Sequence, residues 1–258
     1  MIDKAALTDI ILNKEGYVII DDVLDSKFIS RARKELELAI SKEAEYHGGD
    51  DYSDYGMVLL CALYGGAFIE LFDIEGVTTP INNILGDGSI VYAYTSSSML
   101  PNGKNYSNRI HVDCPRLIPG YSTNLGVIIP LDDFTEKNGA TFILPGSQNM
   151  LESPDEDYFY KNAKMIIAKA GSVIFLNSRL WHSGGNNETN DWRHSLTLNI
   201  CRPYMKQRID IPRAMNGMDT SGFSQSALQK LGFYAQIPVS YDEYYIEPEQ
   251  RKFKQKYE

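Results

Sequence analysis

Cysteine is scarce in this sequence. Its 258 residues include only three cysteines, Cys61, Cys114 and Cys201, which are odd in number and far apart. Disulfide scaffolds use even sets of cysteines, and cysteine zinc sites use closely spaced pairs. We therefore expect neither a disulfide framework nor a cysteine-bound zinc ion. A reducing cytoplasm is the simplest expected location.

Positive charge is in deficit. Lysine and arginine number 25 against 34 aspartates and glutamates, which gives a formal net charge of −9 at pH 7. Proteins that bind nucleic acid present a clustered positive field to the phosphate backbone. We therefore expect no nucleic-acid partner, although a locally basic pocket is compatible with this composition.

Long hydrophobic runs are also missing. A transmembrane helix needs about 20 consecutive apolar residues, and no segment of the sequence approaches that length. The first residues, Met1-Ile2-Asp3-Lys4, lack the basic and then apolar pattern of a secretory signal peptide. We expect a protein that makes no membrane-spanning contact.

Apolar residues are nevertheless abundant enough for a substantial core. Hydrophobic residues make up 43% of the chain and aromatic residues 11%, which argues against intrinsic disorder. No internal repeat or low-complexity linker divides the sequence. We predict a single domain over residues 1–258, with mostly helical support over 1–88, a β core over 89–202, and an irregular C-terminal lid or wrap over 203–258.

Helical periodicity dominates the first 88 residues. The clearest case is the stretch 27–46, where Phe28, Ala32 and Leu36 begin an apolar stripe and Asp25 or Ser26 can cap the helix. Glycines and a proline interrupt the later stretches. The predicted elements are helices over 5–13, 27–46, 57–72 and 79–86, and one buried strand over 17–20.

The pattern changes at Ser89. From there, short β-branched and aromatic runs alternate with turn sequences such as 137–139 and 145–147. Several short strands in succession are typical of a sandwich or barrel. We predict a mainly β, antiparallel core buttressed by the N-terminal helices, with strands over 90–94, 109–113, 125–131, 140–144, 165–169, 172–176 and 193–200.

An imidazole and a carboxylate lie two residues apart at His111 and Asp113. On a strand, residues i and i+2 point to the same face. The pair would then supply two of the three ligands of a 2-His-1-carboxylate Fe(II) site. His182, at the end of a predicted strand and just before Gly184 and Gly185, can supply the third. For His111 and Asp113 alone, a simple ion pair is the alternative.

The last predicted strand has one polar face. Alternation places Arg193, Ser195, Thr197 and Asn199 on that face, which suits a cavity wall, and places His194 on the packing face. We therefore expect a structural role for His194. His47, in a glycine-rich surface turn, is expected to have no functional role.

Taken in order, these residues resemble the phytanoyl-CoA dioxygenase family of Fe(II)- and 2-oxoglutarate-dependent oxygenases. The resemblance covers most of the chain, and it is specific because an arginine follows the distal histidine by eleven residues. The matching segments are Gly16–Ile20 with the helix after it, His111-x-Asp113, Leu131–Asp133, Asn138–Thr141, Leu144–Ser147, Gly171–Phe175, His182 and Arg193.

The resemblance implies a fold and a set of ligands. The fold would be a double-stranded β-helix (a cupin-like jelly roll), and His111, Asp113 and His182 would bind Fe(II). The cosubstrate 2-oxoglutarate and then O2 would take the remaining iron positions, while Arg193 binds the far carboxylate. A buried dicarboxylate needs such a charge-matched, bidentate partner. By the same analogy, Thr141 would add a hydroxyl to that carboxylate, and Asn108 would donate to the cosubstrate's inner end.

Two positions depart from the family pattern. Gly184 stands where the family often has a serine two residues after the distal histidine, and Gln148 stands where it often has a histidine. The first departure affects a hydrogen bond to the cosubstrate, for which Ser183 or Ser195 could substitute. The second affects none of the expected ligands.

The sequence therefore predicts an Fe(II)- and 2-oxoglutarate-dependent oxygenase, most simply a hydroxylase of a small metabolite that releases succinate and CO2. Related halogenases have a small residue at the carboxylate position, so Asp113 favours hydroxylation; desaturation, epoxidation and ring closure stay open. The alternatives are a non-catalytic jelly roll that binds a metal or ligand, and a cupin-type metalloenzyme that does not use 2-oxoglutarate.

Overall fold

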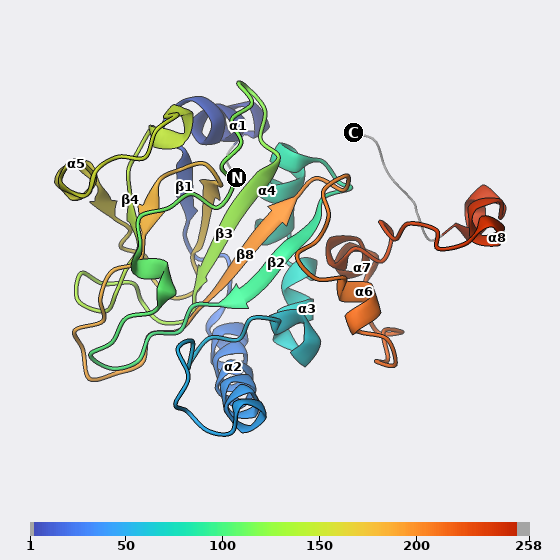
Figure 1. Cartoon of the computed structure of the whole chain (residues 1–258), viewed down its shortest axis with the longest axis horizontal. Helices are drawn as coiled ribbons and strands as arrows, with labels where there is room; N and C mark the ends of the chain where they lie inside the picture. The colour runs from blue at the N-terminus through green and yellow to red at the C-terminus, as the bar shows by residue number, and fades with distance from the viewer. Residues whose placement is uncertain (1–2, 252–258) are drawn as a thin grey trace.

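The computed structural model describes residues 3–251, which form two antiparallel sheets with helices against the larger one (Figure 1). The five-stranded sheet has the order β1-β6-β3-β8-β2, and the three-stranded sheet has the order β5-β4-β7. The larger sheet comprises β1 Tyr17–Ile20, β2 Ile90–Ser96, β3 Asn124–Pro130, β6 Val173–Asn177 and β8 Ser195–Cys201. The smaller comprises β4 Phe142–Ile143, β5 Lys164–Met165 and β7 His182–Ser183.

The larger sheet separates two apolar layers. On β6, Val173 and Phe175 pack into the layer shared with the helices, whereas Ile174 and Leu176 pack into the layer toward the smaller sheet. This division follows from the alternation of side chains along a strand. All four side chains are buried, and the predicted mainly β core with supporting helices is confirmed.

The helices follow local signals in the sequence. In α2 (Ser26–His47), the carboxylate of Asp25 accepts a hydrogen bond from the Phe28 amide at 2.8 Å, and Gly48 ends the helix in the left-handed conformation. The predicted stretch 27–46 is therefore confirmed. The other main helices on this side are α1 Lys4–Asn13, α3 Ala67–Glu70 and α4 Glu75–Leu85, and α5 Glu156–Asn162 lies beside the smaller sheet.

Two helix predictions need correction. Residues 57–72 do not form one helix but the 3-10 helix η1 (Cys61–Tyr64), α3, and the 3-10 helix η2 that starts at Leu71. Gly65 and Gly66 both have positive φ angles, 69° and 55°, which break a right-handed helix at this point. The helix predicted over 79–86 begins earlier, at Glu75, and contains Pro80.

Four strand predictions also need correction. Residues 109–113 form no strand, because only His111 pairs, in a single bridge with His182. The runs 140–144 and 165–169 contract to the two-residue strands β4 and β5. Arg193 precedes β8 rather than lying in it, and its backbone pairs with that of Met99 in a second isolated bridge.

The C-terminal region contains three further helices, α6 Ile211–Ala214, α7 Gln225–Leu231 and α8 Tyr241–Tyr244. Ile211, Ala227 and Leu231 belong to the apolar layer on the helix side of the large sheet. By contrast, α8 stands apart from the body of the molecule at the right of Figure 1. No helix between residues 3 and 251 is long and apolar enough to cross a membrane.

One buried cation connects α7 to α4 and to the loop before β2. The ammonium group of Lys230 donates to Asn82 Oδ1 at 2.6 Å and to Ser89 Oγ at 2.7 Å, and the residue is only 2% exposed. Burial lowers the pKa of Lys230 from 10.5 to about 8. The folded protein therefore binds fewer protons at this residue than the unfolded chain does between these two pH values.

The free energy of unfolding should depend on pH because the folded and unfolded states bind different numbers of protons at Lys230. Because the unfolded state binds more protons in this window, the contribution of Lys230 to stability rises with pH between about 8 and about 10. We expect wild type to gain up to about 3 kcal/mol relative to Lys230→Met across that window. Urea unfolding of both proteins at the two pH values measures this gain. A stability difference that is the same at both would contradict the assignment.

Candidate functional site

A cavity of about 70 Å³ lies between the two sheets. Gly126 of β3, Leu176 of β6 and Thr197 of β8 line it from the larger sheet, and His182 of β7 lines it from the smaller one. Each of the predicted iron ligands contributes to this cavity, as do Arg193, Thr141 and Ser195. Predicted site residues that are far apart in the sequence thus meet in one place.

The three predicted metal ligands converge. The Nε2 atoms of His111 and His182 lie 3.8 Å and 3.9 Å from Oδ1 of Asp113, and the two imidazole centroids are 4.2 Å apart. Within residues 3–251 this is the one group of three His, Cys, Asp or Glu side chains arranged to hold a metal ion. Two nitrogens and one carboxylate oxygen are the donor set of a facial Fe(II) triad.

Backbone pairing, rather than strand alternation, brings the ligands together. The His111 amide donates to the His182 carbonyl at 2.9 Å, and the His182 amide donates back at 3.0 Å. Asp113 follows in a loop, where the Cys114 amide donates to the Ser178 carbonyl. The prediction that these residues meet is therefore confirmed, but the strand geometry from which it was argued is wrong.

Each histidine presents a lone pair to the centre of the triad. Nδ1 of His111 lies 2.8 Å from the carbonyl of Arg109, and Nδ1 of His182 lies 2.9 Å from that of Leu180. A carbonyl only accepts, so each Nδ1 carries the proton and each Nε2 is free to bind a cation. Burial and the neighbouring His182 lower the pKa of His111, which keeps its imidazole neutral. These residues fit an iron ion.

Arg193 is a buried cation, and the carboxylate of Asp132, which stabilises its charge, lies beyond ion-pair distance. It is 2% exposed, and its guanidinium donates to the carbonyls of Ser97 at 2.9 Å and Gly139 at 3.1 Å and to Ser195 Oγ at 2.8 Å. No carboxylate among residues 3–251 forms an ion pair with it. Burial lowers the pKa of Arg193 to about 10, so it remains charged at neutral pH. A buried charge of this kind requires an anion.

The two other predicted cosubstrate contacts differ in position. Thr141 lines the cavity and is nearly buried. Asn108 is not among the lining residues: its amide nitrogen donates to the Gly185 carbonyl and to Asn186 Oδ1, both at 2.9 Å. The structure therefore gives Asn108 a bracing position beside the glycine turn, and its predicted contact with the cosubstrate stays a prediction.

Ser107 is a cavity residue that the sequence did not single out. A Cβ atom on Gly184 would lie 2.5 Å from Ser107 Oγ, so the hydroxyl fills the space of a side chain at position 184. Of the predicted substitutes, Ser183 donates to the Asn108 carbonyl and does not line the cavity, whereas Ser195 does line it. The glycine at position 184 was the available signal, but the contact itself is tertiary.

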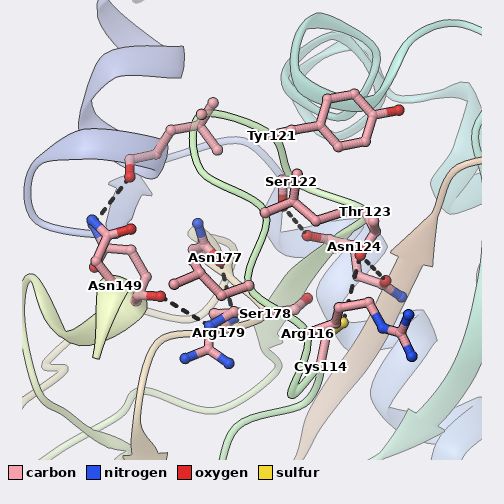
Figure 2. Close-up of a pocket in the computed structure, with 15 residues that line it drawn as sticks. Cys114, Arg116, Tyr121, Ser122, Thr123, Asn124, Asn149, Asn177, Ser178 and Arg179 are labelled. Atoms are coloured by element: carbon pink, nitrogen blue, oxygen red, sulfur yellow. Dashed lines mark hydrogen bonds between the residues drawn. The ribbon is translucent and has the colours of Figure 1, made fainter. Parts of the chain in front are cut away.

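A second, smaller cavity of about 20 Å³ lies behind the loop that follows Asp113 (Figure 2). Ser178 Oγ and Gln148 Oε1 are buried there without a hydrogen-bond partner among the described residues. This volume suits one water molecule. Gln148 also donates to the Lys14 carbonyl at 3.0 Å, so this departure from the family pattern serves packing at the end of α1.

The remaining histidines lie outside the triad. The ring of His194 stacks on Trp192 with centroids 5.5 Å apart, and its Nδ1 lies 2.9 Å from Ser98 Oγ, which confirms a structural position. His47 stacks on Tyr52 at the end of α2, with centroids 4.2 Å apart.

Known proteins share both the sequence pattern and the fold. The family model of phytanoyl-CoA dioxygenase (PhyH) matches residues 12–195, more than two thirds of the chain. The uncharacterized protein Rv1501 of Mycobacterium tuberculosis is 28% identical, over 94% of this chain and 92% of its own length. The dioxygenase hkm4 of Aspergillus hancockii is 34% identical, over 42% of this chain and 38% of its own.

Solved structures show the same fold at low identity. SnoK, described as a non-heme alpha-ketoglutarate-dependent carbocyclase from nogalamycin biosynthesis, matches with a TM-score of 0.63 and 19% identity, over 78% of this chain and 85% of its own. EvdMO1 matches with a TM-score of 0.58 and 20% identity, over 78% of this chain and 50% of its own. The fold is thus a jelly roll whose sheets are not closed into a barrel. With the family model covering most of its length, this chain belongs to the phytanoyl-CoA dioxygenase family.

Proposed function

We propose that this member of an Fe(II)- and 2-oxoglutarate-dependent oxygenase family hydroxylates a small-molecule substrate, with succinate and CO2 as coproducts. His111, Asp113 and His182 hold the iron, and Arg193 binds the distal carboxylate of 2-oxoglutarate. The observation that carries the proposal is the buried guanidinium of Arg193, which lines the same cavity as the converged triad and forms no ion pair with a carboxylate among residues 3–251.

The charges of this site balance when it holds a ferrous ion and 2-oxoglutarate. Two neutral histidines and one aspartate leave a ferrous ion with one net positive charge, and Arg193 adds a second. A cosubstrate with two carboxylates cancels both. Since charges of one sign are costly to bury unpaired, this balance favours a dicarboxylate over a neutral ligand.

The residues of the chain orient the reactants and exclude water. When bound, iron and 2-oxoglutarate supply the oxidising power that converts a substrate C–H bond to C–OH. The carbonyls of Arg109 and Leu180 fix the two imidazole rings, and Phe134, with its ring centroid 4.6 Å from Arg193 Cζ, covers the guanidinium. Asp113 keeps a carboxylate at the position that a halide would need, which supports hydroxylation.

The two alternative functions each lack a specific observation in their favour. A non-catalytic jelly roll would need neither an open triad nor a buried arginine beside it. A cupin-type enzyme that uses no cosubstrate would need the triad but would leave Arg193 without an anion. The combination of both features supports the oxygenase.

Removing the arginine charge should raise the cosubstrate requirement. Truncating one partner of a buried, hydrogen-bonded charge pair costs about 2–5 kcal/mol, so Arg193→Ala should raise the apparent KM for 2-oxoglutarate by roughly 30-fold or more. Succinate release at varied 2-oxoglutarate measures this effect. Iron content should be unchanged, and Arg31→Ala, at a surface ion pair with Glu70, is the matched control. An unchanged KM would remove Arg193 from this role.

Removing a metal ligand should abolish iron binding, whereas Arg193→Ala should leave it intact. His182→Ala leaves two ligands, so we expect loss of bound iron and of succinate release, with 2-oxoglutarate unable to restore either. Metal analysis and the succinate assay test this together. His47→Ala, a histidine outside the cavity, should behave as wild type. Full activity with iron retained in His182→Ala would show that the triad is assigned wrongly.

We propose that Ser107 supplies the hydroxyl that the family often places at position 184. If so, a serine at either position, but not at both, should support the site. A serine at position 184 would overlap Ser107 Oγ, and such overpacking typically costs 1–3 kcal/mol. Gly184→Ser should therefore lower the melting temperature and impair succinate release. The double variant Ser107→Gly/Gly184→Ser should recover both. If the double variant is as impaired as the single one, the clash is not the cause.

A further inference from the structure

The C-terminal arm, residues 236–251, carries an unusual density of exposed apolar side chains. Within nine residues, five large apolar side chains are between 61% and 84% exposed, namely Ile237, Val239, Tyr241, Tyr244 and Tyr245. Figure 1 shows α8, at the centre of the arm, projecting away from the body rather than packing on it. Contiguous exposed apolar surface of this kind marks an interaction site.

The arm is locally ordered although it stands apart. Ser240 Oγ accepts a hydrogen bond from the Glu243 amide at 3.1 Å, and the Glu243 carboxylate accepts one from the Val239 amide at 3.0 Å. The rings of Tyr241 and Tyr245 pack with centroids 4.6 Å apart. A segment that already holds its shape loses less conformational entropy on docking than a disordered one.

The body of the chain has an apolar groove of matching size. This groove, the β2 groove, lies beside the edge strand β2 between η1 and α6, and its volume is about 220 Å³. A cavity of roughly 150 Å³ can hold a benzene ring, so the groove accommodates a tyrosine ring. Its lining includes Leu59, Leu63, Ala93, Ile211 and Ala214.

The charges of the arm and the groove are complementary. Arg208 is the one charged residue that lines the groove, and it is exposed. Among residues 3–251, no carboxylate forms an ion pair with Arg208. Asp242 and Glu243 lie in α8 between Tyr241 and Tyr244. A tyrosine in the groove would bring an acidic neighbour toward the arginine.

We propose that the C-terminal arm of one copy docks into the β2 groove of a second copy, and that the exchange is reciprocal. Because arm and groove lie on the same chain, two copies related by a twofold axis satisfy both contacts at once and leave neither free. After the first arm docks, the second contact is intramolecular, which strengthens the pair. The groove shares no lining residue with the candidate site cavity, so an arm docked in the groove does not occupy that cavity.

Sedimentation equilibrium of the full-length protein tests the proposal. Wild type should sediment at twice the chain mass of 29.1 kDa at micromolar concentrations. Tyr241→Glu/Tyr244→Glu in the arm and Leu59→Glu in the groove should each sediment as monomers. Tyr46→Glu, which changes a residue that is 85% exposed at the end of α2, is the matched control and should remain dimeric. Circular dichroism confirms that each variant is folded.

Mixing the two monomeric variants adds a second test. The arm variant keeps an intact groove and the groove variant keeps an intact arm, so the mixture should regain dimers through one arm–groove contact. A monomeric wild type would overturn the proposal. This holds also if the monomer results from docking of the arm into the groove of its own chain. Dimers that survive either variant would overturn it as well, because another face would then form the interface.

Discussion

A buried positive charge that forms no direct ion pair is the constraint on which the site depends. Arg193 is enclosed by neutral oxygens and by the ring of Phe134, and these contacts orient its guanidinium without neutralising it. The free energy of burying such a charge favours the entry of an anion into the cavity. Because three metal ligands line the same cavity, the anion best suited to it also binds a metal. The proposed function follows from this combination of a buried charge and a triad in one cavity.

The larger sheet serves two purposes through the alternation of its strands. On β8, Leu196 and Leu198 pack against the helices while Ser195 and Thr197 face the catalytic cavity. Packing of the apolar face against the helices holds the sheet in place. The side chains on the polar face are therefore held in position although they are not part of the apolar core. The helices packed on the apolar face therefore support the cavity through the sheet.

Much of the fold and of the candidate site could be predicted from the sequence, because the relevant signals are local or depend on residue chemistry. The cap at Asp25 and its following apolar stripe predicted α2, and histidine and aspartate are recognisable as metal donors wherever they lie. Gly65 and Gly66 marked an interruption of the stretch 57–72, but the short helices around it could not be predicted, since they depend on backbone angles that glycine permits but does not require.

Contacts between distant segments account for the rest. The triad was predicted from strand geometry, yet the position of His111 comes from its backbone pairing with His182. Ser107 was missed because nothing near it in the sequence shows that its hydroxyl meets Gly184. Nothing near Asn108 in the sequence shows that its amide donates to Gly185 and Asn186. Sequence identifies the chemistry of the donors more readily than the tertiary contacts that orient them.

The central claim is that the triad and Arg193 together bind iron and 2-oxoglutarate in one cavity. The most direct measurement is the visible absorption spectrum of the protein under anaerobic conditions as Fe(II) and 2-oxoglutarate are added. The account predicts a metal-to-ligand charge-transfer band that requires both additions and is lost when succinate replaces 2-oxoglutarate. Iron bound at the triad with no such band at saturating 2-oxoglutarate would contradict it.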